Sequence, residues 1–219
     1  MDHYMETSAT WNRIASLYQE RFMELDLYNA TYDFFCASVA TNTKVLDIGC
    51  GPGNITKYIL TKRPDLQLEG IDVAPNMIAL AKQNNPQASF SVMDSRQIDQ
   101  LDATYGGISC GFCLPYLTPP DAQKMISDVF NLLADDGVFY LSFVEGSPSE
   151  SGFKSGSSGD RVYFHFYELE AIKNQLADAG FDTPEIFRVD YQTVNEADVH
   201  TILITKKRTN PTIKDQSAI

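Results

Sequence analysis

A glycine-rich turn is the first feature of the sequence whose residue types and spacing suit chemistry. In the stretch KVLDIGCGPGN, an apolar run that contains Asp47 leads into Gly49, Gly51 and Gly53. A turn with glycines between a strand and a helix lets a ligand approach the backbone closely. We therefore expect a ligand at this turn.

Acids end the next two predicted strands. Asp72 lies about 20 residues after the turn, where a carboxylate can accept two hydrogen bonds from a ribose diol. Asp94 ends the third predicted strand, at a place suited to accept from an adenine amino group. Acids at the ends of three strands around one glycine turn predict an adenosine-containing ligand.

Asp47 bears on whether that ligand carries phosphate. A negative charge at the end of the first strand repels a pyrophosphate and suits a ligand with cationic ammonium and sulfonium groups. We therefore expect the turn to hold an amino-acid nucleoside. Two alternatives stay open: an NAD-dependent oxidoreductase, which shares the glycine turn and the second acid, and a non-catalytic nucleoside-binding protein on the same fold.

The elements that must position these residues alternate along the chain. Apolar runs predict strands at residues 44–48, 67–72, 89–92, 107–110 and 138–144, and helical periods predict helices at 54–61, 75–83, 121–133 and 166–179. Such alternation predicts an α/β fold with a mostly parallel sheet and helices on both faces. Two last strands, at 185–191 and 199–205, are close enough for an antiparallel hairpin at one edge of the sheet.

The chain divides into three predicted parts. Residues 1–43 hold two helical stretches, 7–25 and 27–39, and are expected to cap the active site. Residues 44–207 form the main domain, with a lid loop at about 146–162, where glycine and serine dominate. Residues 208–219 are expected to be a flexible tail. His3 and Tyr4 lie either over the site with the N-terminal segment or in a disordered end.

Composition excludes several classes of function. The formal net charge is −12 and the sequence pI is about 4.5, so a nucleic-acid partner is disfavoured. No apolar run reaches the length of a membrane span, and the polar N-terminus has no signal-peptide pattern. The four cysteines include one CxxC and no second pair, so we expect reduced cysteines in a cytoplasmic protein.

Four segments together resemble a known family. VLDIGCGPGN, EGIDVAPNMIALAK, FSVMDSRQI and NLLADDGVFYLSF are similar to successive motifs of the class I S-adenosylmethionine-dependent methyltransferases, and the similarity spans roughly residues 10–207. The resemblance implies a Rossmann-like, seven-stranded, mostly parallel sheet with a C-terminal antiparallel hairpin. It also implies S-adenosylmethionine as cofactor and S-adenosylhomocysteine as product. The motifs are specific for the superfamily and not for a substrate.

The resemblance also implies roles for residues of the cofactor site. At the methionine end it places Asp47, Gly49, Cys50, Gly51 and Asn54. Asp72 would hold the ribose hydroxyls, and the adenine would contact Val73, Met77, Asp94 and Ser95. Gly111 and Phe112 would touch the methionine and open onto the acceptor, and Tyr18 would close over the cofactor.

The acceptor side is defined less sharply by the sequence. His165 is the best candidate for a general base, and Tyr116 is the second candidate catalytic residue. Tyr116 and Tyr163 are also expected to shape the acceptor pocket. The motif of the amine-methylating DNA and protein-glutamine enzymes is missing after the fourth strand, and no metal site is expected. We therefore predict a methyltransferase that acts on a small molecule, as a monomer or homodimer.

Overall fold

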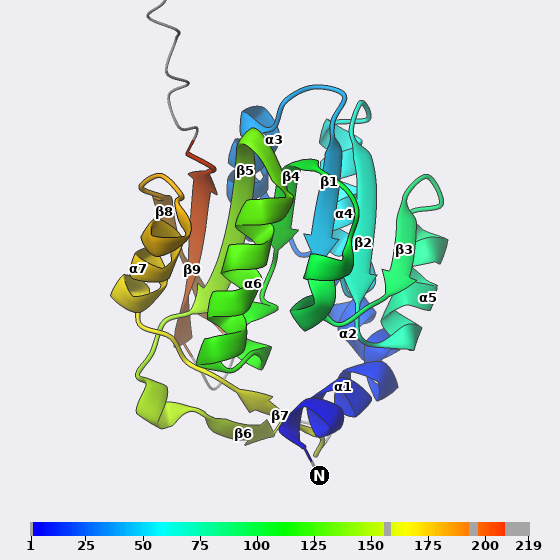
Figure 1. Ribbon diagram of the computed structural model, residues 1–219. Coiled ribbons are helices and arrows are strands. Elements are labelled where there is room, and N and C mark those ends of the chain that lie inside the picture. Colours follow the sequence, from blue (N-terminus) through cyan, green and yellow to red (C-terminus); the bar gives the residue numbers. More distant parts are fainter. Residues whose placement is uncertain (1, 156–158, 193–196, 209–219) are drawn as a thin grey trace, which may run out of the picture.

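The structure, a computed structural model, describes residues 2–155, 159–192 and 197–208, and its centre is a seven-stranded sheet in the order β3-β2-β1-β4-β5-β9-β8 (Figure 1). The strands are β1 (Lys44–Ile48), β2 (Gln67–Asp72), β3 (Ser89–Val92), β4 (Tyr105–Cys110), β5 (Leu133–Val144), β8 (Glu185–Gln192) and β9 (Ala197–Lys206). This confirms the predicted fold class.

Strand direction gathers the predicted site at one edge. β1 to β5 run parallel to one another, so their carboxyl ends meet at the lower edge of the sheet in Figure 1. β9 runs antiparallel to both β5 and β8. The C-terminal hairpin thus lies at the edge of the sheet as predicted, with its second strand on the inside.

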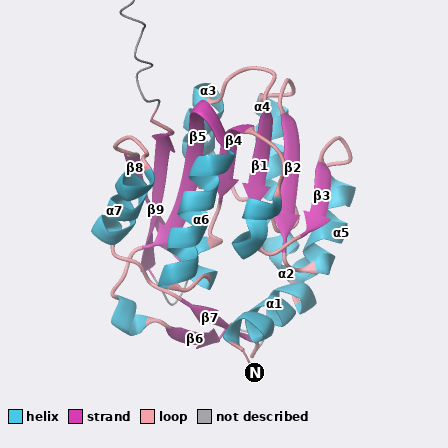
Figure 2. Ribbon diagram, viewed as in Figure 1, coloured by secondary structure: helices cyan, strands magenta, loops and turns pink. Residues whose placement is uncertain are grey.

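Helices cover both faces of the sheet (Figure 2). They are α1 (His3–Arg13), α2 (Ala15–Phe22), α3 (Asn29–Ser38), α4 (Asn54–Lys62), α5 (Pro75–Asn84), α6 (Pro119–Leu132) and α7 (Leu169–Ala179). The apolar stripe of α6 packs with that of α7 on one face, and α3 and α4 pack on the other. The core therefore forms two layers, one on each side of the sheet.

The N-terminal helices cross the carboxyl edge of the sheet, where Figure 1 shows α1 and α2 below the ends of β1 and β2. The sequence predicted one helix over 7–25, and the structure has two, separated at Ile14. The backbone carbonyl of Asn12 accepts a hydrogen bond from the side chain of Asn76 on α5 (2.8 Å). That contact takes up a carbonyl at the end of α1, and the apolar period alone does not reveal it.

The predicted lid loop is in part a β-hairpin. β6 (Gly152–Ser155) pairs antiparallel with β7 (Arg161–Phe164), and the rings of Phe153 and Tyr163 meet across them at 5.2 Å. The high glycine and serine content of the segment predicted a loop, so these cross-strand pairs were not recognised from the sequence. Residues 156–158 of the predicted lid, and 209–219 of the predicted tail, lie outside the described residues.

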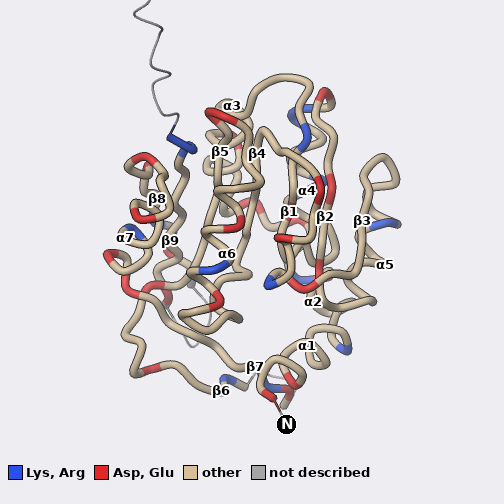
Figure 3. Tube along the Cα trace, in the orientation of Figure 1, with Lys and Arg blue, Asp and Glu red and all other residues tan. Residues whose placement is uncertain are grey.

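The charged residues and the helix lengths of the structure agree with what the composition predicts. Asp and Glu number 29 against 17 Lys and Arg, and Figure 3 shows the acidic residues spread over helices and loops. Among the described residues, no helix is long and apolar enough to cross a membrane.

Candidate functional site

The glycine turn joins β1 to α4 in a backbone shape that suits few residues. Gly49 and Gly51 have φ angles of +66° and +54°, in the left-handed region that side chains disfavour. A side-chain carbon added at Gly49 would lie only 2.8 Å from Cβ of Cys113. The turn therefore needs glycine at position 49 both for its backbone angle and for its contact with the segment after β4.

Asp72 ends β2 beside this turn. Its carboxylate accepts hydrogen bonds from the backbone N–H of Gly51 (3.0 Å) and of Ala74 (2.8 Å). Burial raises the pKa of Asp72 above its ordinary value, although these two bonds act to lower it. The carboxylate is thus fixed in place at the mouth of the turn, with acceptor capacity left for a ligand diol.

Asp94 follows β3 and caps the 3₁₀ helix η1 (Ser95–Gln100). It forms an ion pair with Arg96, whose Nε lies 3.0 Å from each carboxylate oxygen. Burial raises the pKa of Asp94, but the hydrogen bonds and charge of Arg96 outweigh this and hold it below its ordinary value. Arg96 in turn lies over the ring of Tyr4 at 3.9 Å.

The N-terminal helices supply the side of the site opposite the sheet. Tyr18 on α2 lies over the glycine turn, where a side-chain carbon at Gly51 would be 3.6 Å from its ring. Trp11 on α1 contacts the rings of Tyr18 and Tyr116, each at a centroid distance of 5.5 Å. Residues far apart in the sequence thus form one aromatic wall.

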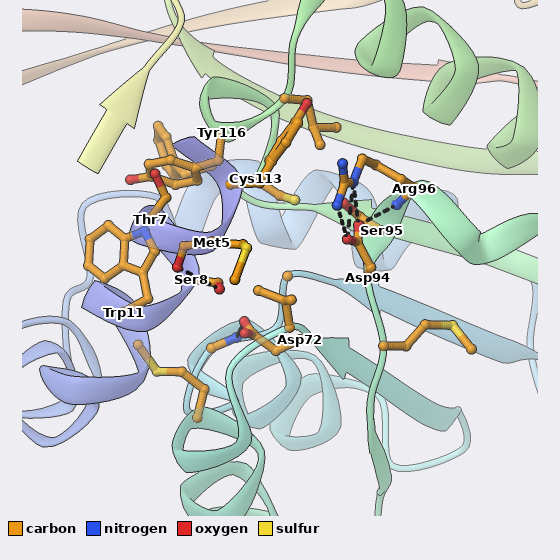
Figure 4. A pocket seen from close by; sticks show the side chains of 18 of the residues that line it. Met5, Thr7, Ser8, Trp11, Asp72, Asp94, Ser95, Arg96, Cys113 and Tyr116 are labelled. Carbon is orange, nitrogen blue, oxygen red and sulfur yellow. Dashed lines mark hydrogen bonds and ion pairs between the residues drawn. The ribbon is translucent and has the colours of Figure 1, made fainter. Parts of the chain in front are cut away.

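These groups enclose a cavity of about 330 Å³ at the carboxyl edge of the sheet, seen closely in Figure 4. It brings together most of the residues predicted for the site. Those in its wall are Tyr18, Gly49, Gly51, Asp72, Val73, Met77, Asp94, Ser95, Gly111, Phe112 and Tyr116. Asp47, Cys50, Asn54 and His165 are not among the residues that line it.

Asp47 lies behind the turn. It is fully buried and accepts hydrogen bonds from Thr56 Oγ1 (2.7 Å) and Ser109 Oγ (2.9 Å). Burial raises its pKa to about 6, in spite of these bonds. In this structure Asp47 holds β1, α4 and β4 together, and its predicted contact with the methionine end stays a prediction.

Cys50 and Asn54 belong to the turn and the start of α4 and lie outside the cavity wall. Cys50 is buried against Ile78, Ala81 and Phe90, and its N–H donates to the Ile71 carbonyl (2.9 Å). Asn54 is the first residue of α4. Their direct contact with a ligand stays a prediction.

His165 lies away from the cavity wall. Its N–H donates to the Pro115 carbonyl (2.7 Å), and its ring packs near His3 and Tyr163 at 5.9 and 4.8 Å. Burial lowers the pKa of His165, and the nearby His3 adds to this effect. The residue after a lid-like stretch was a reasonable candidate from sequence, but the hairpin packs against α1 and carries His165 outside the wall.

The hairpin contacts α1 directly. Thr7 Oγ1 accepts from the Tyr163 N–H (3.0 Å), and Thr10 Oγ1 donates to the Arg161 carbonyl (2.9 Å). Glu6 forms an ion pair with Arg161. The predicted lid therefore holds α1 in place, and α1 is the element that closes the cavity.

Several wall residues were not assigned to the site from the sequence. They are Asp2, Met5, Thr7, Ser8, Trp11, Met93 and Arg96, whereas Tyr4, one of whose two expected places was over the site, also lines the cavity. One usable signal existed, because Trp11 and Tyr18 stand seven residues apart on the predicted apolar stripe of the first helix. In the described ranges, no cluster of three His, Cys, Asp or Glu residues could hold a metal ion.

Comparison with known proteins points in one direction. Residues 45–137 match the model of a methyltransferase domain family. A putative methyltransferase 235L of Invertebrate iridescent virus 6 is 35% identical over 103 residues, which are 47% of this chain and 38% of that protein. A trans-aconitate 2-methyltransferase of Variovorax paradoxus (strain S110) is 33% identical over 98 residues, 45% of this chain and 37% of that protein.

These matches span well under two thirds of the two curated relatives. A solved structure described as a DhpI–SAH complex is similar over more of the chain, with a TM-score of 0.70 at 14% identity, covering 95% of this chain and 97% of that one. At that identity the likeness concerns the fold.

Proposed function

We propose that this chain is a class I S-adenosylmethionine-dependent methyltransferase and that it transfers the methyl group of S-adenosylmethionine to a small-molecule acceptor. One observation carries the proposal. The fixed carboxylate of Asp72, the glycine turn and Asp94 surround a single cavity at the carboxyl ends of β1 to β4.

The charges of the wall fit this cofactor. Three acids, Asp2, Asp72 and Asp94, line the cavity with one cation, Arg96. A ligand with sulfonium and ammonium groups gains from such a wall, whereas a pyrophosphate would be repelled. Asp72 would hold the ribose diol. Asp94 would accept from adenine, because Arg96 leaves part of its acceptor capacity free.

Orientation is the main contribution that the chain can make to methyl transfer. The sulfonium supplies an activated methyl group when the cofactor is bound, and the protein must hold the acceptor in line with it. Phe112 would serve this purpose, because its backbone has a φ of +55° and its N–H donates to Ser142 Oγ (2.9 Å). The hydrogen bond to Ser142 on β5 therefore fixes the backbone of Phe112 at the end of β4.

The size of the cavity supports a small acceptor. A volume of about 330 Å³ is near the lower end of the roughly 300–1,000 Å³ usual for small-molecule sites. α1 covers the cavity, and the acidic surface disfavours nucleic acid. The oxidoreductase alternative fits less well, because β9 runs antiparallel inside the sheet, unlike the parallel dinucleotide-binding arrangement.

A thermal melt with S-adenosylhomocysteine, beside NAD at the same concentration, tests the cofactor. At a concentration a hundred times its dissociation constant, the ligand adds about 2.7 kcal/mol to the free energy of unfolding. For a chain of this length that should raise Tm by roughly 5–10 °C. A shift with NAD alone would overturn the proposal. Release of S-adenosylhomocysteine during incubation with acceptors then separates an enzyme from a silent nucleoside-binding protein.

A further inference from the structure

The cofactor assignment leaves over two charged wall residues, Asp2 and Arg96, and a group of uncharged ones with a distinct chemistry. We name this group the acceptor wall: Met5, Ser8, Trp11, Tyr116 and Leu117. Figure 4 shows Met5, Trp11 and Tyr116 on one side of the cavity, away from Asp94 and Arg96. Its residues are aromatic, aliphatic, thioether or hydroxyl, and none carries a charge. An acceptor that lies here meets flat apolar surface with hydroxyl groups beside it.

The one cation of the whole cavity wall is not free to bind an acceptor. Arg96 donates to both oxygens of Asp94, and its guanidinium lies over the Tyr4 ring at 3.9 Å. A carboxylate acceptor would lose water here and find no unpaired cation to replace it, which is unfavourable for a buried charge.

Two phenols offer neutral hydrogen bonds instead. Burial raises the pKa of both Tyr18 and Tyr116, so their hydroxyls stay protonated at neutral pH. Within the described part of the chain, neither hydroxyl has a hydrogen-bond partner. Trp11 lies between the two rings, at interplanar angles of 87° and 72°. The phenols are therefore available to a polar atom on a flat ligand.

The wall also lacks a group suited to remove a proton from an acceptor. His165 lies outside it. Of the three acids that line it, Asp2 is exposed and accepts the Tyr4 N–H at the start of α1, Asp72 is bound by two backbone N–H groups, and Asp94 is paired with Arg96. A protonated aliphatic amine has no lone pair to attack with and would need such a base. The acceptor must bring its own lone pair at neutral pH.

We infer that the acceptor is a small, flat, uncharged aromatic compound, attacking through a ring nitrogen or a ring hydroxyl, and that carboxylates are rejected. The inference rests on the proposed function and narrows its substrate class. The acceptor's lone pair forms the new bond to the methyl carbon as the carbon–sulfur bond breaks and its electron pair stays on sulfur. A ring hydroxyl then gives its proton to water.

The test uses three naphthalenes that differ in charge: 2-naphthol, 2-naphthoate and 2-naphthylmethylammonium. Each is titrated by calorimetry into the full chain saturated with S-adenosylhomocysteine. We expect 2-naphthol to bind at least tenfold more tightly than either charged compound. Equal or tighter binding of either charged compound, or no binding of 2-naphthol, would overturn the inference.

Variants place the binding in the acceptor wall. Tyr116→Phe should weaken the binding of 2-naphthol about tenfold and leave the affinity for S-adenosylhomocysteine within twofold. Trp11→Ala should weaken the binding of 2-naphthol further. Leu17→Ala, on an exposed side chain of α2 outside the cavity wall, is the matched control and should change neither affinity. Unchanged 2-naphthol affinity in both wall variants would also overturn the inference.

The same titrations keep the two proposals apart. If S-adenosylhomocysteine binds and the naphthalenes show the wrong order, only the acceptor inference fails. If S-adenosylhomocysteine itself does not bind, the proposed function fails and the acceptor inference fails with it.

Discussion

Asp72 is the residue on which the cofactor assignment depends most, because its carboxylate is both fixed by the backbone and open to the cavity. Asp72→Ala should lower the affinity for S-adenosylhomocysteine at least tenfold, since a hydrogen bond to a charged group contributes about 1.5–3 kcal/mol. Calorimetry measures the affinity. Asp99→Ala, an exposed acid outside this wall, is the control. Equal affinities of Asp72→Ala and the unmodified chain would refute the ribose assignment.

Asp47 makes a different prediction, about stability. Its pKa is about 6 in the folded protein against an ordinary 3.8, so folding is favoured by its protonated form. The stability it contributes is complete below about pH 4 and is lost as the pH rises through 6. Asn does not titrate, so Asp47→Asn removes this pH-dependent loss of stability. Between pH 4 and pH 7, the free energy of unfolding of the variant should therefore rise by about 3 kcal/mol relative to that of the unmodified chain.

Chemical denaturation at several pH values measures this difference. Comparing the two chains at each pH cancels the contributions of all other titrating groups. A difference that does not change with pH would mean that Asp47 titrates alike in the folded and unfolded chains.

Residue type explains which parts of the site the sequence could reveal. Gly49 and Asp72, which line the cavity, stood out in the sequence because a left-handed turn favours glycine and the predicted ribose contact calls for an acid. Met5, Ser8 and Leu117 are of ordinary types for a helix or loop, and only the fold brings them to the cavity. The sequence could not show that His165 lies outside the cavity wall, because its place depends on how the hairpin packs.

At the scale of elements, Tyr4 fastens α1 over the cavity. Its hydroxyl donates to Asp121 and accepts from the Thr118 N–H (2.8 Å), and Arg96 lies over its ring. Because Arg96 also binds Asp94, the closure of α1 is connected to the carboxylate expected at the adenine.

Tyr4→Phe should therefore loosen α1 without disturbing the sheet. The lost hydrogen bonds correspond to about 1–1.5 kcal/mol, or roughly tenfold faster hydrogen exchange in α1. Exchange in β1 should be unchanged. Tyr58→Phe, which removes a tyrosine–aspartate hydrogen bond on α4, is the matched control. Faster exchange in both variants alike would contradict a specific role of Tyr4.

The strands and most helices were predictable because their apolar periods are local. β1, β2 and β3 have the predicted bounds, and α4 differs by one residue. The break at Ile14 and the hairpin of β6 and β7 depend on contacts between distant segments, Asn12 with Asn76 and Thr7 with Tyr163. No period in the sequence encodes such contacts.

At the scale of the whole molecule, excess negative charge should limit stability. With a net charge of −12, self-repulsion opposes the compact state, whereas exposed pairs such as Lys124–Asp99 contribute about 0–1 kcal/mol each. Raising the salt from 0.01 to 0.15 M shortens the screening length from about 30 to 8 Å. We expect Tm to rise by a few degrees.

Calorimetry in sodium chloride and in choline chloride checks this prediction, since equal shifts exclude binding of a particular cation. A fall in Tm would mean that attractive ion pairs outweigh the repulsion.

The place of β9 inside the sheet also matters for synthesis of the chain. β5 ends at Val144, but the strand that pairs with its free side ends at Lys206, 62 residues later (206 − 144). At about 5–20 residues per second, the ribosome needs roughly 3–12 s to make that stretch. Throughout this interval an apolar strand presents an open edge, the kind of surface on which nascent chains aggregate. Messenger RNAs whose codons slow translation between these two strands should therefore lower the yield of soluble protein.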